Sequence, residues 1–128
     1  LWVISDRFAD STTVYQGEGR GVPYKQIEQV HDMVIGENWP DLTIILDIDP
    51  KVGVERSKVN IHEDGQVNQE TRFENLDLSF HEKVRQGFQK IASKNYGRCV
   101  LINADDTPEN VHLEIIKHLE KRIRIVAA

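Results

Sequence analysis

The sequence predicts an α/β fold in which helices cover both faces of a parallel sheet. Three short, apolar, β-rich segments alternate along the chain with longer segments of helical periodicity. Strands joined in this way by helices form right-handed crossovers, which place helices on both sides of a parallel sheet. A chain of 128 residues is long enough for one domain with one core. We therefore expect a single three-layer domain over residues 1–128.

The three strands are predicted at residues 1–5, 42–48 and 98–103. The middle segment is a nearly continuous apolar run, which is typical of a strand buried on both faces. Three strands make a small sheet, and the sequence starts inside a strand with Leu1 rather than Met. We therefore expect that part of the fold precedes the first residue of this sequence.

Four helices are predicted from apolar periodicity and from capping residues. Pro23 suits the first position of one helix, and Gly36 is a natural stop after it. The predicted helices cover Pro23 to about Ile35, Pro50 to about Lys58, about Glu74 to Lys94, and the segment that opens at Thr107–Pro108. Residues 59–71 are polar and lack periodicity, so we expect a loop there.

Composition excludes some classes of protein and favours a cytoplasmic one. The net charge of −5 argues against a general nucleic-acid binder, which usually carries a basic face. The longest apolar run is far too short to span a bilayer, so no membrane partner is expected. Cys99 is the only cysteine, which favours a reducing, cytoplasmic compartment. Because Cys99 lies in an apolar run, we interpret it as a buried structural thiol.

Polar residues follow each predicted strand, where α/β sheets bind their ligands. The first strand is followed by Asp6 and Arg7, and the other two by residues 47–50 and 103–108. A carboxylate beside a guanidinium can hold a hydrated metal ion and a phosphate respectively. By itself, however, such a pair is more often an ordinary surface charge pair.

An ordered set of short motifs resembles the thymidylate kinase family, whose members move a phosphoryl group from ATP to thymidine monophosphate. Each motif is weak alone, but the order of the whole set along the chain is specific. The motifs are Asp6-Arg7-Phe8, Ser11-Thr12, Tyr15-Gln16-Gly17, Gly19-Arg20-Gly21, Pro40-Asp41-Leu42-Thr43, Leu46-Asp47, Asp49-Pro50, Gly53 with Arg56, Arg72-Phe73-Glu74 and Leu78 to Arg85.

The resemblance implies roles for residues near the start of the chain. Arg7 would bind the phosphate of thymidine monophosphate and face the transferred phosphoryl group. Asp6 would organise Mg²⁺ through water or act on the acceptor phosphate. Thr12 and Gln16 would lie near the thymine edge, and Tyr15 would pack on the deoxyribose and disfavour a 2′-hydroxyl. An ordinary core tyrosine remains the competing interpretation of Tyr15.

The resemblance also implies a mobile lid at about residues 56–72, in which Arg56 and Arg72 would be the catalytic arginines. Asn103, Ala104 and Thr107 would lie in a loop against the adenine of ATP, the phosphoryl donor. Thr107 also has the pattern of a helix cap, and both roles are compatible. The helix at residues 23–35 would contribute to a homodimer.

The sequence contains no G-x-x-x-x-G-K-[ST] motif, the glycine-rich P-loop that cradles ATP phosphates. We therefore expect the carboxy-terminal part of a domain of P-loop kinase type, missing its amino-terminal P-loop strand and helix and inactive by itself. Two alternatives stay open. One is another P-loop nucleotide or deoxynucleoside kinase, and the other is a non-catalytic α/β module that lost its ATP site.

Overall fold

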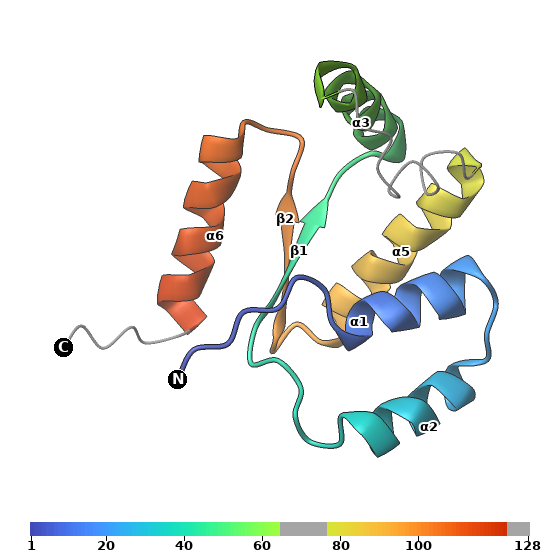
Figure 1. Cartoon of the computed structure of the whole chain (residues 1–128). Coiled ribbons are helices and arrows are strands. Elements are labelled where there is room, and N and C mark those ends of the chain that lie inside the picture. Colours follow the sequence, from blue (N-terminus) through green and yellow to red (C-terminus); the bar gives the residue numbers. More distant parts are fainter. Residues whose placement is uncertain (65–76, 123–128) are drawn as a thin grey trace.

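The computed structural model describes residues 1–64 and 77–122 of the chain. Within this part, β1 (Thr43–Asp47) and β2 (Cys99–Asn103) form a parallel pair. Figure 1 shows α6 (Pro108–Arg122) on one side of this pair, and α5 (Leu78–Lys94) with α1 (Ala9–Thr12) on the other. The predicted α/β class, with a parallel sheet between helical layers, is confirmed.

The prediction of a first strand at residues 1–5 is wrong. The segment carries no strand, and Val3 and Ile4 are 83% and 93% exposed. A strand needs a neighbour for its backbone hydrogen bonds, and the described strands pair only with each other. Apolar, β-rich composition alone therefore does not produce a strand here.

The chain next forms α1, which continues into the π-helix η1 (Thr13–Gly19). Val14 of η1 is fully buried, with 0% exposure, against α5. The close approach depends on Gly87 of α5, because a Cβ atom there would lie 3.0 Å from Cγ1 of Val14. The helix pair therefore packs tightly through a glycine.

Helix α2 (Tyr24–Val34) agrees with the helix predicted at residues 23–35 except at its ends. Pro23 is the capping residue rather than the first helical one, since its ψ of 128° is extended. Gly36 stops the helix as predicted. Its φ of 55° is left-handed, and its amide donates to the carbonyl of His31 at 3.2 Å.

Helix α3 (Pro50–Asp64) starts as predicted, with the Asp49 carboxylate accepting from the amide of Lys51 at 2.9 Å. It extends to Asp64, so the prediction that it ends near Lys58 and that residues 59–64 form a loop is wrong. The sequence has no glycine or proline between Gly53 and Gly65 to stop the helix earlier. Residues 65–71 of the predicted loop lie outside the described part.

Helix α5 begins at Leu78 rather than near Glu74. Asp77 is its cap, since the carboxylate accepts from the amide and the hydroxyl of Ser79. An aspartate in this position competes with the helix for backbone donors and therefore starts a helix rather than continuing it.

The core lies between α5 and the strands, and includes Ile45, Ala92 and Cys99. Cys99 is 4% exposed, as predicted, and burial raises the pKa of its thiol, which suits a structural role. The prediction that the middle strand is buried on both faces is wrong, because Leu46 of β1 is 52% exposed toward the α6 side. Among the described helices, none combines the length and apolarity that crossing a bilayer requires.

Candidate functional site

Arg7 lies in an unusual backbone conformation immediately before α1. Its φ is 67°, in the left-handed region, which costs a non-glycine residue about 1 kcal/mol or more. The hydroxyl of Ser5 donates to the carbonyl of Arg7 at 2.8 Å and supports this turn. The Arg7 side chain lies over the ring of Tyr15, with 5.6 Å between Cζ and the ring centroid. Two predicted substrate residues are therefore in contact.

Tyr15 belongs to a cluster of aromatic rings between η1 and α5. Its ring centroid lies 6.2 Å from that of Phe80 and 6.2 Å from that of Phe88, in tilted and edge-on geometry. Such pairs favour defined ring orientations. Tyr15 is half-buried. The cluster thus presents an aromatic surface next to a guanidinium, which suits a phosphorylated nucleoside, and it also fits an ordinary packing role.

Arg7 and Tyr15, together with the predicted residues Asp6, Thr12 and Gln16, form a first group near the start of the chain. Asp6 and Thr12 are exposed, and Gln16 is half-buried. Asp6 makes no hydrogen bond or ion pair within the described part of the chain. The described residues also contain no group of three or more His, Cys, Asp or Glu side chains that could hold a metal ion. Asp6 is therefore a solitary, accessible carboxylate.

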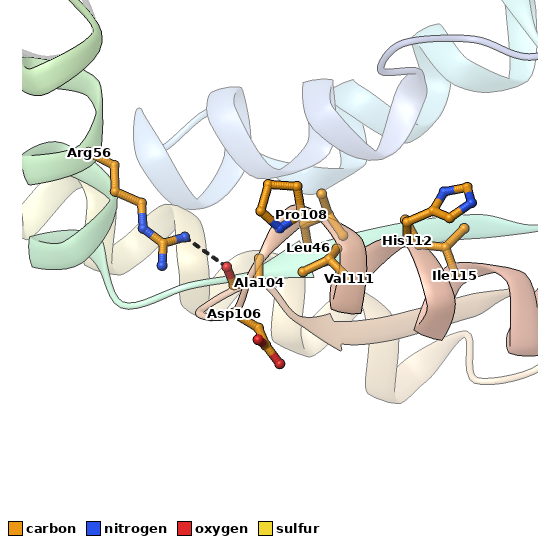
Figure 2. Close-up of a pocket in the computed structure, with 8 residues that line it drawn as sticks. All are labelled: Leu46, Arg56, Ala104, Asp106, Pro108, Val111, His112 and Ile115. Atoms are coloured by element: carbon orange, nitrogen blue, oxygen red, sulfur yellow. Dashed lines mark hydrogen bonds between the residues drawn. The ribbon is translucent and has the colours of Figure 1, made fainter.

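A second group surrounds the loop between β2 and α6. Arg56 of α3 donates to the carbonyl of Ala104 at 2.9 Å and to the carboxylate of Asp105 at 2.7 Å. Figure 2 shows Arg56 reaching from α3 toward this loop, beside a hollow of about 610 Å³. The hollow is lined by Leu46, Arg56, Ala104, Asp106, Pro108, Val111, His112 and Ile115. Arg56 and Ala104, predicted separately, are thus brought together.

Asn103 and Thr107 give this loop its shape. The side-chain oxygen of Asn103 accepts from the amide of Asp105 at 3.0 Å. The hydroxyl of Thr107 accepts from the amide of Asn110 at 3.3 Å, so the predicted helix cap is confirmed. Asn103 therefore bonds to the loop backbone and Thr107 to the first turn of α6, and Ala104 is the predicted loop residue that lines the hollow.

The two groups are anchored at different ends of the strand pair. Asp10 of α1 bonds to Thr43, the first residue of β1, whereas Ala104 donates from its amide to the carbonyl of Asp47, the last. No hydrogen bond or ion pair links Asp6 or Arg7 to the residues that follow β1 and β2 in the described ranges. Arg72, the second predicted lid arginine, lies outside those ranges.

Sequence reasoning missed an ionic cluster at the end of β1. Arg85 donates from Nε and Nη2 to the two oxygens of Asp47 at 2.9 and 2.8 Å, and Gln89 donates to Asp47 at 3.2 Å. Arg85 Nη1 also lies 3.6 Å from the carboxylate of Asp49. The hydrogen bonds from Arg85 hold the pKa of Asp47 below its usual range, and the same pair raises the pKa of Arg85.

The signal for this cluster was present in the sequence but incomplete. Arg85 and Gln89 stand four residues apart and so share one face of a helix, and Asp47 ends an apolar strand. Nothing local indicates that this face meets that strand end. The cluster connects α5, which carries the rings around Tyr15, to the carboxyl end of the sheet.

Comparison with known proteins gives one consistent result. The thymidylate kinase family model matches residues 1–115. The chain is 45% identical over 122 residues to a thymidylate kinase of Maridesulfovibrio salexigens, which covers 95% of this chain and 56% of the relative. It is 39% identical over 123 residues to a thymidylate kinase of Desulforapulum autotrophicum, with 96% and 54% covered.

A solved structure agrees with these relatives. The crystal structure of thymidylate kinase from Ehrlichia chaffeensis superimposes with a TM-score of 0.62 at 37% sequence identity, over 89% of this chain and 48% of that one. The chain therefore spans about half the length of the proteins it matches.

Proposed function

The chain belongs to the thymidylate kinase family, and on this premise we propose that its full-length protein transfers a phosphoryl group from ATP to thymidine monophosphate. The product is thymidine diphosphate, for dTTP synthesis. The observation that best supports the proposal is the contact of Arg7 with Tyr15, backed by Phe80 and Phe88. It provides a phosphate ligand beside a cluster of aromatic rings.

The acceptor nucleotide binds at this first group. Arg7 makes no ion pair within the described residues, so its donors are available for the phosphate, which a guanidinium binds with two parallel hydrogen bonds. Tyr15 packs on the deoxyribose, where its bulk disfavours a 2′-hydroxyl. Thr12 and Gln16, which follow on α1 and η1, lie near the thymine edge.

ATP binds at the second group. The apolar part of the hollow, formed by Leu46, Pro108 and Val111, suits one face of the adenine ring. Asn103, Ala104 and Thr107 shape the loop beside it. Arg56 and Arg72 act from a lid at about residues 56–72, where arginines stabilise the charge that develops on the transferred group. Arg56 would first have to leave Asp105, which exposes both charges to solvent at little cost because the pair is already exposed.

The exposed carboxylate of Asp6 suits Mg²⁺ bound through water rather than by direct coordination. The ion usually keeps several waters and binds one or two carboxylates together with substrate phosphates. Asp6 is a single exposed carboxylate next to the phosphate ligand Arg7, so it would hold the ion through water. When bound, Mg²⁺ neutralises negative charge on the phosphates.

The protein is proposed to act as a cytoplasmic homodimer. The outward face of α2 exposes Val30, Met33 and Val34 at 55%, 86% and 77%. These residues, three and four positions apart, form an apolar stripe that a second copy would cover. The cytoplasmic location rests on the single, buried cysteine.

The test is turnover of the full-length protein with ATP and a panel of nucleoside monophosphates. We expect thymidine monophosphate to give the highest kcat/KM. A preference for another monophosphate would indicate a different P-loop kinase. Absence of turnover with every acceptor would support the non-catalytic alternative.

Arg7→Ala provides the residue-level check. Loss of a charge-assisted donor to the reacting phosphate should lower kcat/KM by about 100-fold or more. Lys117→Ala on α6 removes a positive charge that lines neither group and is the matched control. Equal kcat/KM for both variants would contradict the assignment of Arg7.

A further inference from the structure

A buried ion pair fixes α1 to the start of both strands. Asp10 is 6% exposed. Arg98, directly before β2, donates from Nη1 and Nη2 to its two oxygens at 2.8 and 2.7 Å. Arg98 Nη1 also donates to the hydroxyl of Thr43 at 3.0 Å, and that hydroxyl lies 3.4 Å from Asp10. Each of these three side chains therefore has a hydrogen-bond partner within the set.

The pair is also enclosed by an aromatic ring. The guanidinium of Arg98 lies over Trp39, 4.9 Å from the ring centroid. Trp39 in turn contacts the imidazole of His31 on α2 edge-on, with 5.5 Å between centroids. The hydrogen bonds that Arg98 donates to Asp10 raise the pKa of Arg98, which stays protonated. The edge of the Arg98 guanidinium is thus held by Asp10, and its face by the ring of Trp39.

This pair anchors the chain close to Arg7. Asp10 stands three residues after Arg7, and α1 with η1 forms one short helical segment over residues 9–19, which is only marginally stable alone. Arg7 itself is in a left-handed conformation, which persists only when the surrounding structure enforces it. A bidentate Arg–carboxylate contact fixes the relative orientation of the two side chains as well as the distance between them.

We propose that Asp10 and Arg98 are positioning residues that hold Arg7 and Tyr15 in the geometry that the acceptor nucleotide requires. Neither side chain touches the nucleotide. This inference rests on the proposed function, and it extends the acceptor site to residues at the amino-terminal end of the strands. A purely structural pair would lower stability and leave acceptor binding unchanged.

The test uses the full-length protein and measures KM for thymidine monophosphate and for ATP separately. Asp10→Asn and Arg98→Lys each keep the approximate volume of the side chain but lose the bidentate hydrogen bond between Arg98 and Asp10. We expect KM for the acceptor to rise roughly tenfold or more, since small displacements of positioning groups have large effects, with KM for ATP within twofold of wild type. Assays are run well below the melting temperature of each variant, with folding verified by circular dichroism.

Thr43→Val is the milder variant, in case Asp10→Asn does not fold. It removes one hydroxyl from the set and should raise the acceptor KM by a smaller factor, with the same selectivity over ATP. Glu114→Gln on α6 is the control and should change neither KM. A lower melting temperature with unchanged acceptor KM, or an equal rise in both KM values, would overturn the inference. Failure of the wild type to use thymidine monophosphate would instead overturn the proposed function.

Discussion

Asp47→Asn tests the ionic cluster at the carboxyl end of β1. The side chain of Asp47 is 16% exposed and accepts two hydrogen bonds from Arg85. Asparagine has nearly the same shape but offers one acceptor oxygen, and its amide nitrogen would face a donor of Arg85. The substitution therefore removes the charge and one of the two hydrogen bonds without creating a cavity.

The expected loss of stability follows from how deeply the carboxylate is buried. Hydrogen bonds to a charged group contribute about 1.5–3 kcal/mol when shielded from water, whereas exposed ion pairs contribute about 0–1 kcal/mol. Asp47 is mostly buried, but its partner Arg85 is 33% exposed, so solvent screens part of the interaction. We expect Asp47→Asn to cost about 1–2 kcal/mol, or roughly 3–8 °C in melting temperature.

The effect should depend on pH in a defined direction. Arg85 lowers the pKa of Asp47 in the folded state below its ordinary value of 3.8. A group with a lowered folded pKa contributes stability that is complete above the unfolded pKa and is lost as pH falls through the folded pKa. The difference between wild type and Asp47→Asn should thus be complete at pH 7 and shrink as the pH falls below about 4.

The assay is urea unfolding followed by circular dichroism, at pH 7 and at steps down to about pH 3. Glu114→Gln removes an exposed carboxylate that pairs with Lys117 on α6, and its midpoint should stay at the wild-type value. If both variants shift the midpoint equally at pH 7, the assignment of a shielded pair is wrong. A difference that persists unchanged at the lowest pH would show that the Asp47 charge is not its source.

Three further outcomes are expected. Gly87→Ala should lower stability by about 1 kcal/mol in chemical denaturation, because overpacking against Val14 and Glu18 outweighs the better helix propensity of alanine; a more stable variant would contradict the tight packing. Tyr15→Ala in the full-length protein should reduce the preference for thymidine over ribothymidine monophosphate in kcat/KM, and an unchanged ratio would leave Tyr15 a packing residue. The isolated 1–128 chain should not convert thymidine monophosphate above a mock-purified control, because it contains no P-loop; measurable conversion would refute this.

Local sequence alone determined several features that the structure confirms. The apolar run ending at Asp47 predicts β1, and the caps at Asp49 and Thr107 set the starts of α3 and α6 within one residue. Gly36 ends α2 because a left-handed residue is needed there. Each of these depends on contacts between residues close in the chain, so periodicity and capping rules are sufficient. The ordered motifs likewise led to the family that the comparisons support.

Tertiary structure decided the features that depend on distant partners. Residues 1–5 have strand composition, yet a strand forms only where a neighbour supplies hydrogen bonds. Asp47 meets Arg85 across 38 positions, and Asp10 meets Arg98 across 88. Local periodicity does not indicate which helix packs on which end of a strand. Neither ion pair could therefore be predicted from the sequence. The contact of Arg7 with Tyr15 also depends on tertiary packing, because the packing of α1 and η1 against α5 determines both positions.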